Sequence, residues 1–174
     1  MAAVVFLRGV NVGGHKKFQP SALARELANL GVVNVGAAGT FVVRGAIGRE
    51  SLRKEILRRL PFESELMICP AREILGMVQS QPFGPEAPRK DVQWFVSVMG
   101  KPPRSLPPLP MDQPIGDKWE VRVIRVTGRY AFSLKRRQGR GVYPNEVVEK
   151  KLGVSATTRG WNTITAICGI LESA

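Results

Sequence analysis

The chain has 174 residues, enough for one domain or for two small halves. Hydrophobic residues make up 44% of the sequence and charged residues 23%, which is close to the average for globular proteins and excludes wholesale disorder or a coiled coil. Charge departs from that average, because 26 Lys and Arg outnumber 14 Asp and Glu and give a net charge of +12. This excess predicts attraction to polyanions or phosphorylated ligands and carries no information about fold.

Several functional classes are disfavoured by what the sequence lacks. Cys69 and Cys168 lie far apart in apolar segments, which predicts reduced core residues and neither a disulfide nor a cysteine-based metal site. There is no apolar run of about 18 residues, and Met1–Val10 has no cleavage pattern, so we expect a cytoplasmic protein without a membrane segment. The single histidine, His15, removes His-pair zinc sites and most Ser/His/Asp triads. We therefore expect no metal and no cofactor.

The first half alternates strands and helices. Apolar periodicity, glycines and prolines predict a strand, a helix, two short strands joined by a tight turn, a second helix and a last strand. The expected ranges are 2–10, 20–30, 32–46, 50–60 and 66–69, followed by another helix at 71–79. This order is typical of the ferredoxin-like sandwich, in which the helices cover one face of an antiparallel sheet.

The second half follows a connector that contains Pro82, Pro85 and Pro88. Strands are expected next, two of them as a hairpin around Thr127-Gly128, together with an irregular Pro-rich stretch and two helices. In chain order these are a strand at 93–99, the irregular stretch at 101–116, the hairpin at 119–126 and 129–135, a helix at 146–152, an extended segment at 156–159 and a helix at 162–172. The sequence thus predicts an α+β fold of two ferredoxin-like halves with mainly antiparallel sheets, at 1–81 and 92–174, joined by a connector at 82–91.

Basic residues are densest on and just after the expected hairpin. Both halves contribute to the excess of positive charge, so it does not come from a disordered tail. Within Arg136–Gly141, glycine amides and guanidinium groups could hold a phosphate together, which makes this a candidate nucleic-acid-binding cluster. A solvated basic loop is the favoured alternative, because charge runs are common on protein surfaces. The cluster consists of Arg122, Arg125, Arg129, Lys135, Arg136, Arg137 and Arg140.

A second candidate site is the glycine-rich turn at Arg8–Lys17, between the first strand and the first helix. Many α/β proteins bind anions at this position, although the turn has neither the P-loop spacing nor the dinucleotide-binding spacing. A structural turn with glycines at positive φ is an equally good interpretation. The residues expected to bind a phosphate or carboxylate are Arg8, Asn11, Gly13, Gly14 and Lys16, with Arg159 and Asn162 if both ends of the chain meet at one pocket.

Two aromatic segments have both a core and a functional interpretation. Trp161 precedes the last helix, which Asn162 or Thr163 is expected to cap, and serves as a core anchor or as a stacking platform. Tyr130 and Phe132 share one side of a strand that is similar to the aromatic strand of RNA-recognition modules. Burial in the core is the commoner fate of such residues.

Three stretches together resemble the bacterial family called domain of unknown function 1697. They are Phe6–Gly14, Gln81-Pro82-Phe83 and Leu152–Thr163, and the resemblance spans nearly the whole chain. It implies two ferredoxin-like halves and no established activity. The family pattern has Gln-Ser-Gly-Asn-Val where this chain has Ala37–Phe41, and a basic stretch with Ser/Thr and Lys where this chain has Gly141–Asn145.

Three functions stay open. The chain is a binding module for nucleic acid or another polyanion, a binder or enzyme for a small phosphorylated or carboxylate ligand at Arg8–Lys17, or a protein whose basic face meets an acidic partner. The spacing of the residues assembles no carboxylate pair, metal set or nucleophile with its base, so the sequence supports no particular reaction.

Overall fold

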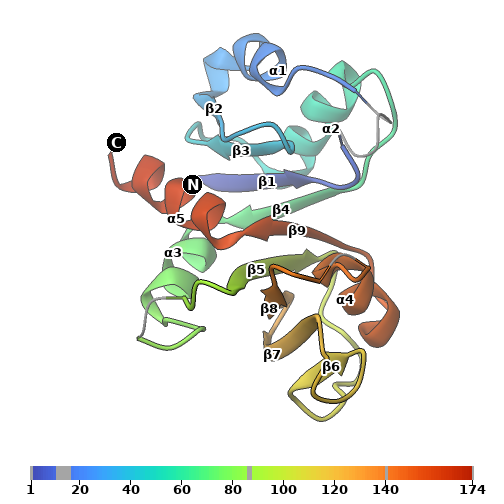
Figure 1. Cartoon of the computed structure of the whole chain (residues 1–174). Coiled ribbons are helices and arrows are strands. Elements are labelled where there is room, and N and C mark those ends of the chain that lie inside the picture. The colour runs from blue at the N-terminus through green and yellow to red at the C-terminus, as the bar shows by residue number, and fades with distance from the viewer. Residues whose placement is uncertain (1, 11–16, 86–87, 140, 174) are drawn as a thin grey trace. The chain divides into compact units, whose positions relative to one another are not determined.

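The structure is a computed structural model that describes residues 2–10, 17–85, 88–139 and 141–173 (Figure 1). The chain forms two compact units: unit 1 comprises Met1–Gln79 and Thr165–Ala174, and unit 2 comprises Ser80–Ile164. Each unit contains one antiparallel sheet, which confirms the predicted α+β fold of two halves. Residues 165–174 group with unit 1, although they follow unit 2 in the chain.

Unit 1 has the predicted order of elements. Its sheet has the strand order β2-β3-β1-β4, with every neighbouring pair antiparallel, which is the ferredoxin-like arrangement. The elements are β1 (Ala3–Leu7), α1 (Pro20–Glu26), a short 3₁₀ turn (Ala28–Leu30), β2 (Val32–Asn34), β3 (Thr40–Val43), α2 (Arg49–Arg59), β4 (Leu66–Pro70) and α3 (Ala71–Gln79).

Both faces of β1 are buried, which explains its continuous apolar sequence. Val5 and Leu7 point to the face that α1 and α2 cover, where they join one core cluster with Leu23 of α1 and Ile56 of α2. Val4 and Phe6 point to the opposite face and are fully buried. The spacing of the leucines in α1 and α2 therefore directs both helices to the same side of the sheet.

The last part of the chain is tied into unit 1 by polar contacts. The Sγ of Cys168 lies 3.8 Å from the carbonyl oxygen of Ile74 in α3, and Nη2 of Arg44 donates to the carbonyl oxygen of Ile170 at 2.6 Å. Cys168 and Cys69 are both buried and are not joined in a disulfide, as the sequence predicts. Burial and the nearby Glu172 raise the pKa of the Cys168 thiol, which keeps it protonated.

Unit 2 has a five-stranded antiparallel sheet in the order β6-β7-β8-β5-β9. Apart from the edge strand β6, this repeats the strand order of unit 1, with irregular chain in place of the first helix. The prediction that all of 101–116 is irregular is wrong for β6, because three residues between prolines are too few to show alternation. The elements are β5 (Val92–Met99), β6 (Met111–Gln113), β7 (Val121–Thr127), β8 (Tyr130–Arg136), α4 (Pro144–Leu152), β9 (Ala156–Gly160) and α5 (Trp161–Glu172).

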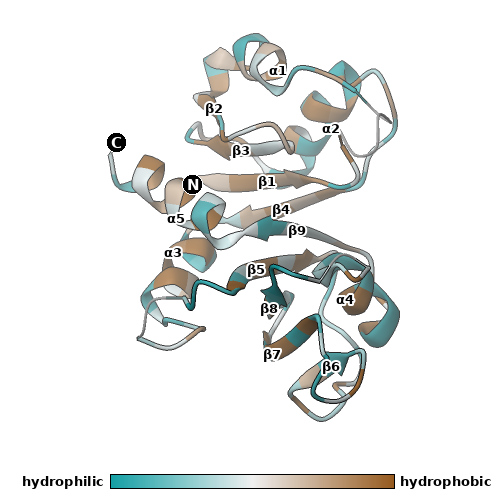
Figure 2. Ribbon diagram, viewed as in Figure 1, coloured by the Kyte–Doolittle hydropathy of each residue, from teal (hydrophilic) through white to brown (hydrophobic). Residues whose placement is uncertain are grey.

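The two faces of the unit 2 sheet are covered differently. On one face, Val147 and Val148 of α4 pack on a core that includes Val123 and Ala131, so α4 carries both hydrophobic and hydrophilic stretches in Figure 2. On the opposite face, the ring of Phe83 stacks on Trp94 with the centroids 4.6 Å apart. Phe83 also meets Phe132 and Trp161 edge to face, at 5.8 and 5.1 Å. The Gln81-Pro82-Phe83 stretch thus supplies the centre of an aromatic cluster.

We expect Gly39→Ala to destabilise unit 1 by about 3 kcal/mol. Gly39 has a φ of +79°, and an added Cβ would lie 2.8 Å from Cβ of the fully buried Leu7. Gly36→Ala is the matched control, because Gly36 has a φ of +73° and no atom within 4 Å of an added Cβ. The Gly36→Ala variant should lose only about 1 kcal/mol of unfolding free energy, which is the cost of a left-handed backbone conformation for a residue with a Cβ. Urea denaturation measures both free energies of unfolding, and equal losses would contradict the steric argument.

Candidate anion-binding surface

The sheet divides the predicted basic cluster between its two faces. Successive residues of β8 point to opposite faces, and Lys135 pairs with Val121 of the core beneath α4. Arg122 pairs with Leu134, and Arg136 lies two residues beyond Leu134, so both arginines are on the face opposite α4. One continuous run of basic residues in the sequence therefore does not form one surface.

Two arginine side chains are fixed around Trp119. The Cζ atoms of Arg122 and Arg136 lie 4.5 and 4.0 Å from the centroid of the indole ring. Arg122 also donates two hydrogen bonds to the Asp112 carboxylate, at 2.7 and 2.9 Å. Arg136 donates to the carbonyl oxygens of Asp117 and Trp119, at 2.8 and 3.0 Å. Trp119 is 8% exposed and so offers no free ring face for base stacking.

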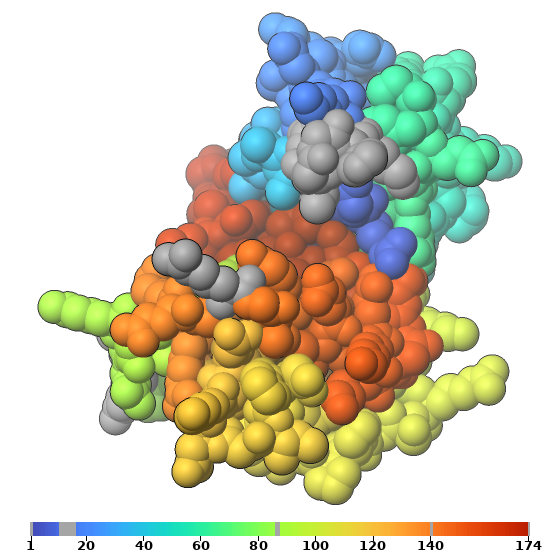
Figure 3. Space-filling view, turned by 45° about the vertical axis from the view of Figure 1, so that its right-hand side comes forward, coloured from blue at the N-terminus to red at the C-terminus, as the bar shows by residue number. Residues whose placement is uncertain are grey.

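The other basic residues of the cluster have different surroundings. Arg125 and Arg137 are exposed, and Nε of Arg137 donates to the carbonyl oxygen of Lys90 at 2.8 Å. Arg129 donates from Nε to the carbonyl oxygen of Met99 at 2.9 Å. In Figure 3 the β7–β8 hairpin and the residues beside it, coloured gold to orange, lie at the surface. Arg140 lies outside the described residues.

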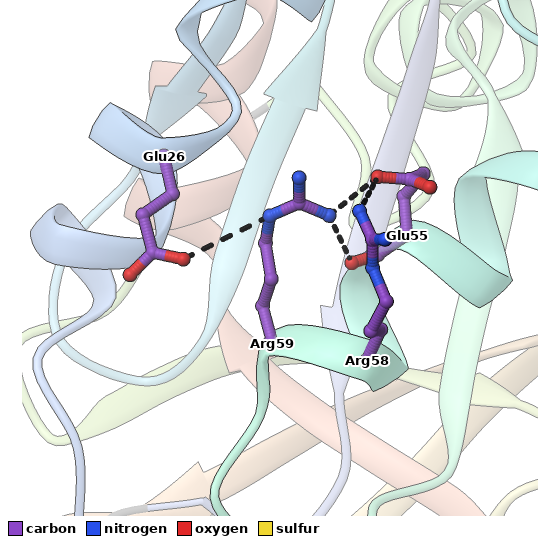
Figure 4. Close-up of polar contacts among 4 residues, drawn as sticks. All are labelled: Glu26, Glu55, Arg58 and Arg59. Carbon is purple, nitrogen blue, oxygen red and sulfur yellow. Dashed lines mark hydrogen bonds and ion pairs between the residues drawn. The ribbon is translucent and has the colours of Figure 1, made fainter.

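Two arginines near the end of α2 have a carboxylate partner instead. In α2, Glu55 accepts hydrogen bonds from Arg58 and Arg59, and Arg59 also faces Glu26 at 3.8 Å (Figure 4). The hydrogen bond from Arg59, with smaller contributions from both arginine charges, lowers the pKa of Glu55. The two glutamates of α2 thus offset two of the five basic charges of the helix.

Charge is distributed unequally between the units. Unit 2 contains fifteen Lys and Arg against seven Asp and Glu, a net charge of +8, whereas unit 1 contains eleven against seven, a net charge of +4. Residues 117–141 alone contain eight Lys and Arg and two Asp and Glu. The unbalanced charge of the protein is therefore concentrated on the β7–β8 hairpin and its flanks.

Most of the predicted glycine-rich site falls on residues that the structure does not describe. Asn11, Gly13, Gly14, His15 and Lys16 all lie outside the described residues. The backbone of Arg8 is anchored, because its amide donates to the Glu65 carbonyl at 3.0 Å and its carbonyl accepts from Ser64 Oγ at 3.1 Å. Arg8 belongs to unit 1, whereas Arg159 and Asn162 belong to unit 2. A shared site for these residues stays a prediction.

Arg159 is a buried cation on β9. Its side chain is 6% exposed, and Nη1 donates to Thr157 Oγ1 at 2.7 Å and to the Thr158 carbonyl at 3.0 Å. Burial lowers the pKa of Arg159 to about 10, so the guanidinium is still charged at neutral pH. Asn162 is exposed within the first turn of α5, which begins at Trp161. The prediction that Asn162 or Thr163 caps the helix is therefore wrong by two or three residues, because Gly160 precedes the helix.

The aromatic strand of the sequence analysis belongs to the core. Tyr130 and Phe132 are 8% and 3% exposed, and Phe132 is covered by Phe83 of the same unit. These rings cannot stack on RNA bases as the surface aromatics of an RNA-recognition module do. The core interpretation is confirmed, and any contact with nucleic acid through this hairpin would use arginine.

Neither a metal site nor a membrane-crossing helix is found in the described part of the chain. No group of three His, Cys, Asp or Glu side chains there is arranged to hold a metal ion. None of the helices described has the length and apolar character that crossing a membrane requires.

Comparison with known proteins places the chain in a family. The model of the family described as protein of unknown function DUF1697 matches residues 1–123. The chain belongs to the DUF1697 family. A solved structure, that of the conserved bacterial protein SP0830 from Streptococcus pneumoniae, superposes with a TM-score of 0.55 at 16% identity, covering 95% of this chain and 96% of that chain. This shows that the two proteins share a fold. No curated protein matches the sequence.

We expect the Asp112–Arg122 pair to make stability depend on pH. The hydrogen bond from Arg122, followed by the charges of Arg122 and Arg136, lowers the pKa of Asp112 in the folded state. The pair therefore stabilises the protein above the ordinary pKa of an aspartate, and this contribution is lost as pH falls through the lowered value. Asp112→Asn should cost about 1 kcal/mol near neutral pH, and this cost should shrink progressively as pH falls below the ordinary pKa of an aspartate.

Urea denaturation across this pH range measures the difference. Asp117→Asn is the control, because Asp117 is exposed and its carboxylate has no partner among the described residues. A constant cost of Asp112→Asn at every pH would contradict the ion-pair interpretation.

Proposed function

We propose that this protein binds nucleic acid through the hairpin surface of unit 2, which consists of Arg122, Arg125, Arg129, Arg136 and Arg137. The observation that carries the proposal is that two arginines of this surface are held by neutral acceptors. Arg136 and Arg137 donate to backbone carbonyl oxygens, whereas Arg122 pairs with the Asp112 carboxylate. A carbonyl oxygen holds a guanidinium in place without cancelling its charge, so the positive potential outside the hairpin is retained.

The proposed contacts are made to phosphates. Trp119 and Phe132 are buried, so the surface has no aromatic platform on which bases could stack. Guanidinium groups bind phosphate oxygens with two parallel hydrogen bonds, and phosphate contacts carry no sequence information directly. We therefore propose binding that is independent of base sequence and that weakens steeply with salt, because bound counterions are released.

The proposal is tested by fluorescence anisotropy of labelled single-stranded RNA and duplex DNA, titrated at low and near-physiological salt. The double variant Arg125→Gln/Arg137→Gln removes two exposed charges of the surface. For duplex DNA it should lower the slope of log K against log salt by about 0.9 for each phosphate that the variant no longer neutralises. Arg72→Gln is the matched control, since Arg72 is an exposed arginine on α3 of unit 1.

Three results would contradict the proposal. They are the absence of binding at low salt, binding that does not change with salt, and equal decreases in affinity in the double variant and in Arg72→Gln. An acidic protein that co-purifies after nuclease treatment, with no binding of either nucleic acid, would favour a protein partner for the basic face instead.

A further inference from the structure

Unit 1 contains a cavity of about 190 Å³ between the start of α2, the start of β1 and the end of β4. Its floor includes Ala3 of β1 and Ile68 and Pro70 of β4, on the face of the sheet that α2 covers. Ile47, before α2, and Leu52, within it, line the cavity from the helix side. The cavity therefore lies between a helix and a sheet of the same unit.

The lining of this cavity changes from buried and apolar to exposed and charged. Leu52 and Ile68 are 1% and 3% exposed, whereas Ala3 and Ile47 are half-buried. Arg49 also lines the cavity and is exposed. Among the described residues of the lining, no other side chain is a carboxylate, an ammonium or a guanidinium. The cavity thus combines an apolar interior with one cation at its opening.

The guanidinium of Arg49 has no polar partner among the described residues. Glu50 is adjacent in the sequence, but its carboxylate faces Arg53, with 3.8 Å between Oε1 and Nε. The other arginines of α2 have acceptors, since Arg53, Arg58 and Arg59 all donate hydrogen bonds to carbonyl or carboxylate oxygens. Arg49 is therefore the arginine of this helix that is available to a ligand.

The first turn of α2 adds positive potential near Arg49. Gly48 precedes the helix and provides no capping side chain. Its φ of −67° suits any residue, and an added Cβ would have no atom within 4 Å, so neither backbone conformation nor crowding requires a glycine. The helix dipole contributes partial positive charge at this end, of the same sign as the guanidinium.

We propose that unit 1 binds a small amphipathic monocarboxylate, with its apolar tail in this cavity and its carboxylate beside Arg49. A guanidinium binds a carboxylate with two parallel hydrogen bonds, and one guanidinium balances its single charge. An apolar cavity of about 150 Å³ binds benzene, so the volume here suits a benzene ring or an aliphatic tail of about six carbons. The site lies in unit 1 and does not depend on nucleic-acid binding by unit 2.

The test uses hexanoate as the probe and the whole chain, followed by ¹H–¹⁵N NMR. Hexanoate should shift amide resonances around the cavity saturably, with a Kd of about 1 mM. Hexanamide, which has the tail without the charge, should bind about tenfold more weakly. Arg49→Gln should weaken hexanoate binding by about tenfold and leave hexanamide binding unchanged. Lys54→Gln is the matched control, because Lys54 is an exposed cation of α2 outside the lining.

Ala3→Leu is the second variant, because the larger side chain fills the cavity from its floor. It should abolish binding of both hexanoate and hexanamide, and its Tm without ligand shows whether it is folded. Arg125→Gln/Arg137→Gln should bind hexanoate like the unmodified protein, so failure of this site and failure of the nucleic-acid surface are distinguishable. No saturable shifts with hexanoate, unchanged binding in Arg49→Gln, or equal weakening in Lys54→Gln would overturn the proposal.

Discussion

The alternation of side chains along β8 determines how unit 2 is organised. This strand lies between β7 and β5, so its residues are held in register on both sides and each points to a defined face. Phe132 is directed to the aromatic cluster around Phe83, whereas Ala131 is directed to the core beneath α4. The same alternation places Arg136 and Lys135, which are adjacent in the sequence, on opposite faces with different surroundings.

The arginines at the end of α2 in unit 1 and at the end of β8 in unit 2 have different partners, although the two units share a strand order. In unit 1 the helix α2 faces solvent, and a glutamate one turn away from each arginine of the pair Arg58 and Arg59 compensates its charge. In unit 2, Arg136 and Arg137 lie at the end of β8 and donate to backbone carbonyl oxygens, whereas Arg122 on β7 pairs with the Asp112 carboxylate. The fold thus turns a general excess of basic residues into a local positive surface on one unit.

The sequence predicted most of the fold because the elements of unit 1 are strongly periodic. Leu52 and Ile56 mark the buried side of α2, and Pro20 and Gly31 mark the start of α1 and the end of the turn that follows it. The prediction failed at β6, where three residues between prolines show no period, and at the start of α5. The basic residues were identified from composition, but their partners were not.

The sequence by itself determined the fold class, the sign of the charge and the segment where basic residues concentrate, because these depend on local composition and periodicity. Only the tertiary structure decided which of these residues act together. Asp112 and Arg122 come together through strand register, which depends on pairing between separate segments of the chain. The Ser133 hydroxyl is buried on β8 without a hydrogen-bond partner among the described residues, and this too is a property of packing, since any serine in a strand has the same sequence signal.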